Sequence, residues 1–189
     1  MKRIFDLFFG LILLLFLVII MLLIAIAIRL TSKGPLIYWS DRIGKNNKIF
    51  KMPKFRSMLI DTPAVATHLL DNPDSYLSPV GKFLRTTSLD ELPQLFSVLK
   101  GEMSFVGPRP ALYNQDDLIS LRTKKGVDKL LPGITGWAQV NGLRGPTDTE
   151  GAMTKRFQHD LYYIKNWNLM LDVYILVRTI FVVLFQRVD

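Results

Sequence analysis

The chain has 189 residues, of which 49% are hydrophobic and 21% are charged, and it contains no cysteine. This composition excludes a disulfide framework, a cysteine-ligated metal centre and thiol catalysis, and two histidines leave little for a histidine-based metal cluster. The apolar content and the net charge of +8 argue against disorder and leave nucleic acid, an anionic membrane or a phosphorylated substrate as candidate partners.

The first predicted element is a long apolar helix. Leu7 to Ile28 are 22 consecutive residues without a charge, which as a helix would be roughly 33 Å long, enough to cross a bilayer. A cleaved signal peptide would have a shorter apolar core and a small-residue cleavage site, and a buried core helix is the third alternative. We expect a retained membrane helix, which assigns residues 1–30 to the membrane and 31–189 to a catalytic domain of one unit.

Basic residues flank this helix on both sides. Residues 29–56 carry eight basic side chains and a single acid, Asp41, while Lys2 and Arg3 precede the helix. Juxtamembrane basic clusters are attracted to anionic cytoplasmic leaflets, so the positive-inside tendency draws both ends to the cytoplasm. A re-entrant helix satisfies both ends, and a simple span is the alternative.

The remaining chain predicts an α+β fold in which helix outweighs strand. A small β-hairpin is expected from Leu36–Trp39 and Ile49–Met52, around Gly44–Asn47. The segments Gly107–Pro110 and Leu131–Gly136 are rich in proline and glycine and are expected to be irregular. Predicted helices cover Pro79–Arg85, Glu91–Lys100, roughly Asn114–Lys124, Thr149–Lys165 and Leu169–Arg187.

The last of these helices is apolar around almost its whole circumference. It contains Asp172 and Arg178, which would be costly near the middle of a membrane span. An interfacial amphipathic or core-packing helix is therefore expected, with a second span as the alternative.

The residues best suited to chemistry lie in the segment Ser88–Leu95. Pro93 belongs in the first turn of a helix, which would put Asp90 and Glu91 at the helix N-terminus, where carboxylates stay ionised. Such a pair suits a Mg²⁺ ion or a nucleophile that attacks phosphorus. The alternative is ordinary capping, because Ser88 and Glu91 also fit a capping box.

Cations around this segment favour the chemical interpretation. Arg85 lies just upstream, Arg109 stands between two prolines, and Lys54 and Arg56 flank Phe55. Lysine and arginine side chains of this kind bind phosphate oxygens, although each could also be a solvated surface charge.

These motifs together resemble the bacterial sugar transferase family, the monotopic polyprenyl-phosphate phosphoglycosyl transferases. The resemblance covers essentially the whole chain, whose length is similar to that of minimal members consisting of the catalytic domain alone. The matching segments, after the apolar N-terminus, are Lys54–Met58, Ser88–Leu95, Leu99–Pro110 and Pro132–Gly142.

The resemblance implies a transferase that moves a phosphosugar from a UDP-sugar to undecaprenyl phosphate and releases UMP. This reaction initiates the synthesis of surface glycans such as O-antigen, capsule or exopolysaccharide. By motif position, Asp90 would be the nucleophile that forms an aspartyl-phosphosugar, and Glu91 would help to hold Mg²⁺. The other implied site residues are Arg109 for phosphate, Lys54, Arg56, Arg85 and Gln94 in support, and Gln139 and Asn141 toward the nucleotide or sugar.

The chain departs from the family at one place. Members usually break the N-terminal helix with Ser-Pro, whereas the matching positions here are Val18 and Ile19. We still expect the helix to return to the cytoplasmic face of the bacterial inner membrane, with packing near Asp172 and Arg178 compensating for any bend.

A membrane-tethered scaffold that binds nucleic acid through Arg29–Arg56 is the competing function class, and a member that binds without turnover is another. The chain has no recognised nucleic-acid motif, so we expect UDP-sugar, undecaprenyl phosphate and membrane lipid as partners, with downstream glycosyltransferases as further candidates. Glucose, galactose and N-acetylated or amino-deoxy hexoses are all compatible with the sequence.

Overall fold

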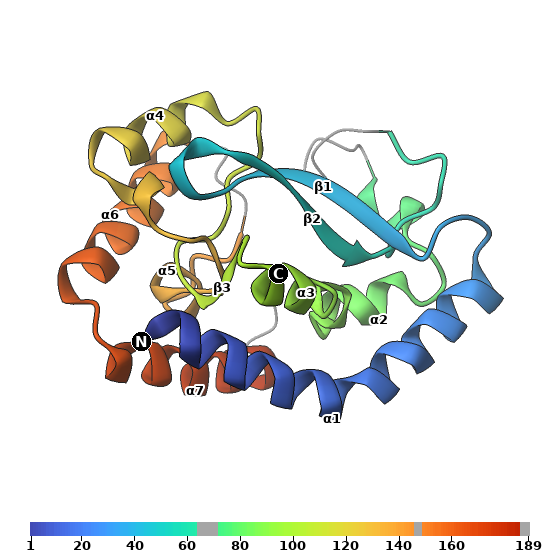
Figure 1. Cartoon of the computed structure of the whole chain (residues 1–189). Coiled ribbons are helices and arrows are strands. Elements are labelled where there is room, and N and C mark those ends of the chain that lie inside the picture. Colours follow the sequence, from blue (N-terminus) through green and yellow to red (C-terminus); the bar gives the residue numbers. More distant parts are fainter. Residues whose placement is uncertain (64–71, 146–148, 186–189) are drawn as a thin grey trace.

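Helices make up most of the computed structural model, which describes residues 1–63, 72–145 and 149–185 (Figure 1). The helix-dominated α+β class predicted from the sequence is confirmed. The helices are α1 (Lys2–Thr31), α2 (Gly81–Thr86), α3 (Gln94–Lys100), α4 (Asp116–Lys124), α5 (Trp137–Val140), α6 (Glu150–Asn166) and α7 (Leu169–Phe185). The strands are β1 (Ile37–Ile43), β2 (Ile49–Phe55), β3 (Ser104–Val106) and β4 (Gly133–Thr135), and short 3-10 turns include η4 (Leu89–Glu91) and η5 (Val127–Lys129).

The predicted β-hairpin is present, and its strands are longer than predicted. β1 and β2 pair in antiparallel register from Ile37 opposite Phe55 to Ile43 opposite Ile49. In the turn between them, Asn46 and Asn47 both have positive φ, which asparagine tolerates better than most residues. The hairpin carries Lys54 near the end of β2.

A second, parallel pair of strands corrects one prediction. The segment Leu131–Gly136 was expected to be irregular, but β4 lies within it and pairs with β3. Glycine allows the close approach: a Cβ atom at Gly133 would collide with the backbone nitrogen of Gly107. Strands of three residues are too short to show an alternating sequence pattern, so the sequence did not predict that these two distant segments pair.

The N-terminal end of α1 is anchored to the rest of the domain by polar contacts. The Lys2 ammonium lies 2.5 Å from the Asp172 carboxylate at the start of α7. Arg3 donates to the carbonyl of Leu99 at the end of α3. The buried Asp6 accepts hydrogen bonds from the Ser104 hydroxyl and the Phe105 amide of β3.

The other end of α1 is anchored as well. The Arg56 guanidinium donates to the carbonyl and the hydroxyl of Ser32 and to the carbonyl of Lys33. Ile28 is fully buried nearby, in a cluster with Phe55 and Leu84. A helix of 30 residues is about 45 Å long, and both of its ends contact the same domain.

α1 is one continuous helix that does not reverse its direction. Figure 1 shows it bowed along one face of the molecule, with both ends turned toward the domain. Of the two residues expected to compensate for a bend, Asp172 does contact α1, through Lys2. Arg178 instead donates to the Tyr174 hydroxyl and the Val140 carbonyl.

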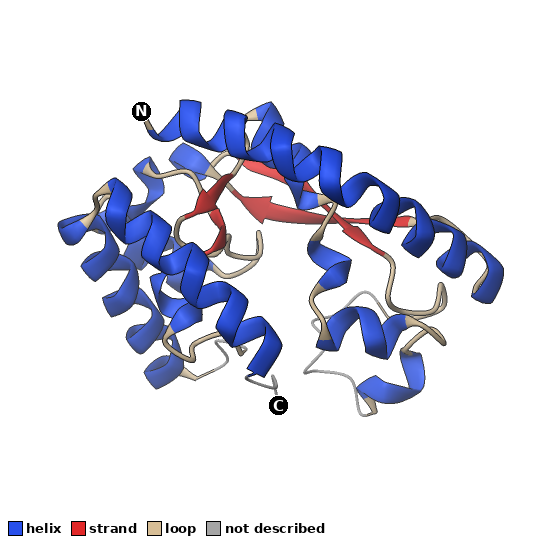
Figure 2. Cartoon of the chain, turned by 90° about the horizontal axis from the view of Figure 1, so that it is seen from below, coloured by secondary structure: helices blue, strands red, loops and turns tan. Residues whose placement is uncertain are grey.

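α1 and α7 together form an apolar face. Figure 2 shows both helices running across the same side, α1 from the N-terminus and α7 toward the C-terminus. Among the described residues, α1 alone is long and apolar enough to cross a membrane, whereas α7 is not. Exposed apolar side chains on these two helices include Phe8, Leu15, Phe16 and Leu30 on α1 and Met170, Phe181 and Phe185 on α7.

Candidate active site

The turn η4 carries the two adjacent carboxylates, Asp90 and Glu91. The sequence predicted a helix beginning at Glu91, but α3 begins at Gln94 and Pro93 is its N-cap residue. Ser88 is left-handed, with φ 58°, and makes no side-chain cap hydrogen bond, so the capping-box interpretation is wrong. The carboxylates therefore lie in a tight turn before the helix.

Glu91 is held by two cations. Its Oε1 atom lies 2.7 Å from the Lys54 ammonium and 3.0 Å from the Arg109 guanidinium. Burial would raise the pKa of Glu91, but the two cations outweigh burial and hold the pKa well below its usual range. Glu91 in turn raises the pKa of Arg109. The two cations therefore favour the ionised form of the Glu91 carboxyl.

Asp90 has a different environment from its neighbour. Asp90 is 9% exposed, and burial raises the pKa of its carboxyl. Lys54 opposes that increase, the negative charge of Glu91 adds to it, and Arg85 and Arg109 lower the pKa again. Two adjacent carboxylates whose pKa values are moved apart are typical of sites that assign them different roles.

Two further arginines belong to this cluster and were missed by the sequence analysis. Burial and the neighbouring Arg109 lower the pKa of Arg42 to about 10, while Glu91 opposes that shift. Arg144 donates to the Ser88 hydroxyl, and burial lowers its pKa, with Glu91 and Asp90 acting against the decrease. Arg42 lies in β1 and Arg144 in the loop after α5. No sequence motif around either arginine indicates that it lies near Asp90.

The other predicted site residues are distributed more widely. Arg85 acts electrostatically on Asp90, and Gln94 is 2% exposed at the start of α3. Arg56 directly follows β2, and its side chain donates to the carbonyls of Ser32 and Lys33 after α1, whereas the ion pairs of Glu91 are with Lys54 and Arg109. Its predicted support of the site stays a prediction.

Gln139 and Asn141 lie in and just after α5. Gln139 is buried and donates to the Ile134 carbonyl. Asn141 is exposed and donates to the Trp137 carbonyl. Their predicted contact with a nucleotide or sugar also stays a prediction.

Two cavities in the described chain lie away from the carboxylates. One, of about 290 Å³, is lined by Lys2, Asp6, Tyr163 and Trp167 among others, beside the start of α1. The other, of about 30 Å³, lies behind the Arg109 segment and is too small for a sugar nucleotide, since ligand pockets usually measure about 300–1,000 Å³. Neither cavity is lined by Asp90 or Glu91.

The donor set fits Mg²⁺ only in partnership with a phosphorylated substrate. The described residues contain no group of three or more metal-ligating side chains. Lys54 and Arg109 both donate to the same oxygen of Glu91, Oε1. Mg²⁺ is often bound by one or two carboxylates together with substrate phosphates and water, which is the arrangement that Asp90 and Glu91 could supply.

Comparison with known proteins shows that the chain matches one family along almost its whole length. The family model described as "Bacterial sugar transferase" matches residues 1–186. The chain is 42% identical over 184 residues to the UDP-glucose:undecaprenyl-phosphate glucose-1-phosphate transferase of Escherichia coli, covering 96% of this chain and 39% of that protein. It therefore spans about two fifths of the length of this relative.

Two other relatives differ in length and in printed substrate. The exopolysaccharide production protein PSS of Rhizobium leguminosarum is 40% identical, over 95% of this chain and 93% of that protein. The UDP-N-acetylgalactosamine-undecaprenyl-phosphate N-acetylgalactosaminephosphotransferase of Aeromonas hydrophila is 39% identical, over 82% of this chain and 37% of that protein.

Proposed function

Because the chain belongs to the bacterial sugar transferase family, we propose that it transfers the phosphosugar of a UDP-sugar to undecaprenyl phosphate and releases UMP. The proposed product is undecaprenyl-diphosphate-sugar, the initiating intermediate of a surface polysaccharide. The relatives' names support both substrates, and the name of the Rhizobium leguminosarum protein supports exopolysaccharide production.

The charge balance at η4 is the observation that carries this proposal. Lys54, Arg85 and Arg109 act to lower the pKa of Asp90, and Glu91 opposes the decrease that burial causes in the pKa values of Arg42 and Arg144. In the part of the chain that the structure describes, these five cations against two carboxylates leave a surplus of three positive charges. A surplus of this size in a partly buried site suits the diphosphate of a nucleotide sugar and the phosphate of a lipid acceptor.

Asp90 is the proposed nucleophile. A carboxylate oxygen of Asp90 attacks the sugar-bearing phosphorus, and the bond from this phosphorus to the bridging oxygen breaks with its electron pair leaving on UMP. A phosphate oxygen of undecaprenyl phosphate then attacks the aspartyl phosphorus, and the carboxylate of Asp90 leaves. Two displacements replace one encounter of three components.

The neighbours of Asp90 have separate roles in this scheme. Arg109 and Lys54 neutralise phosphate charge while keeping Glu91 ionised, and Glu91 would hold Mg²⁺ together with substrate phosphates. When bound, the metal ion would supply further neutralisation of the diphosphate charge.

The position of η4 fits an acceptor that is embedded in a membrane. Leu89 and Leu92, on either side of the carboxylates, pack against a buried cluster in which Met21, Ile24 and Ile28 of α1 lie together with Phe55 and Leu84. The turn that carries the carboxylates is therefore linked through this cluster to α1, the helix that contributes to the apolar face. A lipid phosphate at the membrane surface and a nucleotide sugar from water could both reach this position.

We also propose that α1 lies in one leaflet and does not cross the bilayer. A crossing helix would separate its ends by about the thickness of the membrane, whereas Lys2 and Ser32 both bind the same folded domain. The basic residues at both ends favour the cytoplasmic face of the inner membrane.

A UMP-release assay tests the function. We expect one or more UDP-sugars in a panel to yield UMP with undecaprenyl phosphate and Mg²⁺, and the Asp90→Asn variant to yield none. Asp116→Asn, which alters an exposed carboxylate in the first turn of α4, should retain wild-type activity. Nucleic-acid binding at physiological salt without UMP release from any UDP-sugar would instead favour a scaffold.

A further inference from the structure

The Pro108–Pro110 segment that carries Arg109 has an unusual set of hydrogen bonds. Its two prolines have no N–H group to donate. Its three consecutive carbonyls, however, all accept hydrogen bonds from residues that are distant in the sequence. The carbonyl of Pro108 accepts from the Gly133 amide at 3.0 Å, that of Arg109 from Arg122 at 2.8 Å, and that of Pro110 from Arg42 at 3.4 Å. The shorter of the two arginine contacts is that of Arg122, and its acceptor is the backbone of Arg109, the residue proposed to bind phosphate.

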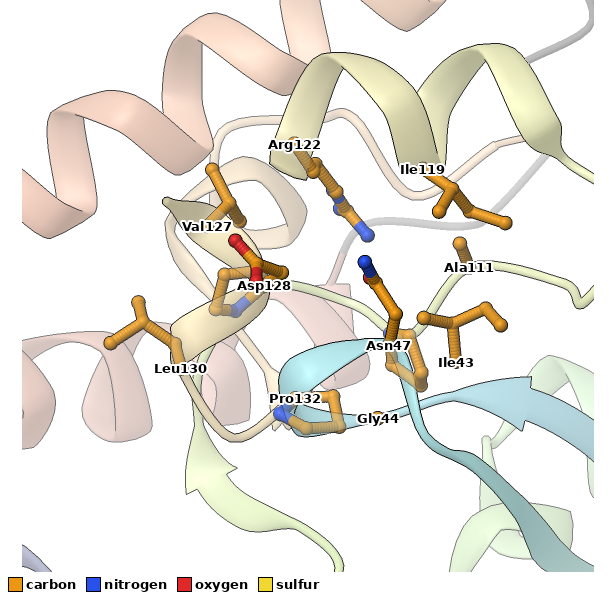
Figure 3. A pocket seen from close by; sticks show the side chains of 12 residues that line it. Ile43, Gly44, Asn47, Ala111, Ile119, Arg122, Val127, Asp128, Leu130 and Pro132 are labelled. Carbon is orange, nitrogen blue, oxygen red and sulfur yellow. The ribbon is translucent and has the colours of Figure 1, made fainter. Parts of the chain in front are cut away.

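Arg122 is a buried cation whose charge is already paired. It is 7% exposed on α4, and its Nε and Nη2 atoms lie 3.0 and 2.6 Å from one carboxylate oxygen of Asp160 on α6. Its third nitrogen, Nη1, is the one that donates to the Arg109 carbonyl. Figure 3 shows the Arg122 side chain reaching down from α4 toward the end of the hairpin near Gly44 and Asn47.

We propose that Arg122, oriented by Asp160, is a positioning residue for Arg109. The buried ion pair fixes the plane of the Arg122 guanidinium, and the guanidinium fixes the backbone of Arg109. The Arg109 side chain is thereby directed to Glu91, 3.0 Å away. This inference deepens the proposed function and rests on it, because the role of Arg109 is to bind substrate phosphate.

A purely structural role is the competing explanation, since the Arg122–Asp160 pair also links α4 to α6. The two explanations differ in one respect. A positioning residue loses its effect on catalysis once the Arg109 side chain is gone, whereas a structural residue weakens the enzyme by the same factor in either background. The Arg122→Lys substitution keeps the positive charge. Its single ammonium group, however, lacks the planar fork with which the guanidinium binds both Asp160 and the Arg109 carbonyl.

The experiment is a double-mutant cycle on UMP release, with Arg122→Lys, Arg109→Gln and the double variant. We expect Arg122→Lys to lower kcat/KM about tenfold in the wild type and less than twofold in the Arg109→Gln background. Val127→Ala is the matched control, because Val127 is buried, lines the same small cavity as Arg122, and has an apolar side chain that cannot donate a hydrogen bond to the Arg109 carbonyl. It should lower the unfolding temperature with less than twofold loss of kcat/KM.

The outcomes are separable. Equal losses from Arg122→Lys in both backgrounds, or wild-type activity in Arg122→Lys, would overturn the positioning role. If Arg122→Lys does not fold, Asp160→Asn enters the same cycle, with the same expected pattern and the same contradicting one. A wild-type protein that releases no UMP would reject the proposed function itself, independently of Arg122.

Discussion

Glu91 and Asp90 are neighbours in the sequence with opposite electrostatic environments. Lys54 and Arg109 keep the pKa of Glu91 below its usual range against the effect of burial, while burial raises the pKa of Asp90. The stability that Glu91 contributes through its ion pairs is present above its unfolded pKa and is lost only as the pH falls through the depressed folded value. Asp90, the proposed nucleophile, is the carboxylate whose ionisation responds first to acid.

The acid limb of the pH profile should report on Asp90. Only the ionised carboxylate attacks phosphorus, so kcat/KM should fall as the pH decreases through the raised pKa of Asp90. Because Lys54 lowers that pKa, Lys54→Met should move the acid limb to higher pH. Lys51→Met, an exposed position on the same strand, should leave the limb in place. A limb that stays fixed or moves to lower pH in Lys54→Met would contradict this assignment.

Removal of metal should abolish activity without unfolding the protein. The described residues contain no preformed cluster of metal ligands, so we expect a Mg²⁺ ion that is shared between Glu91 and the substrate phosphates. EDTA should stop UMP release, and added Mg²⁺ or Mn²⁺ should restore it, while the unfolding temperature of the protein alone stays the same. Full activity after exhaustive chelation would remove the ion from the mechanism.

Part of the site could be recognised from the sequence and part could not. Asp90, Glu91, Lys54 and Arg109 stand in distinctive local motifs, and the structure brings the last three into direct contact. Arg122 contacts the Arg109 backbone only because α4 packs beside the Pro-Arg-Pro segment. Contacts of that kind depend on tertiary packing, which no local pattern encodes.

Elements with a strong local pattern were predicted well. The hairpin and the helices α2, α4, α6 and α7 were expected within a few residues of their observed bounds. The predicted end of the last helix, beyond residue 185, lies outside the described residues. The start of α3 was placed three residues too early, because the η4 turn satisfies the same Asp-Glu-x-Pro pattern as a helix N-terminus.

The anchoring of α1 by its first turns can be tested by cross-linking. The rings of Phe9 and Phe105 lie 5.1 Å apart, and the chain has no native cysteine. A Phe9→Cys/Phe105→Cys protein in membranes should be cross-linked within the chain by a short thiol-specific reagent, detected as a mobility shift. If the N-terminus were on the far side of the bilayer, the thiol at position 9 would be too far from that at position 105 for the reagent to join them.

The control for this experiment uses the neighbouring residue. Phe8 is 68% exposed on the apolar face, so Phe8→Cys/Phe105→Cys should cross-link much less efficiently. Absence of cross-linking in the Phe9 pair, with both thiols reactive after solubilisation, would show that α1 leaves the domain and would favour a span.

At the scale of the whole molecule, α1 and α7 lie along the same side (Figures 1 and 2), and both carry many exposed apolar side chains. Met21, Ile24 and Ile28 of α1 are buried in the cluster against which Leu89 and Leu92, the neighbours of the carboxylates, also pack. The long apolar helix α1 is therefore also part of the structural support for the candidate active site. α1 continues through Val18 and Ile19 without reversing its direction, and the polar contacts of Lys2 and Arg56 hold its two ends against the domain.

The central claim is that Asp90 carries the phosphosugar between donor and acceptor, and trapping that intermediate tests it most directly. The protein is incubated with its UDP-sugar and Mg²⁺ without undecaprenyl phosphate and is then analysed by intact-mass and peptide mass spectrometry. We predict the mass of one phosphosugar on the peptide that contains Asp90, its loss on addition of undecaprenyl phosphate, and no adduct in a folded Asp90→Asn variant. An adduct on a different residue, or normal UMP release by Asp90→Asn, would contradict the account.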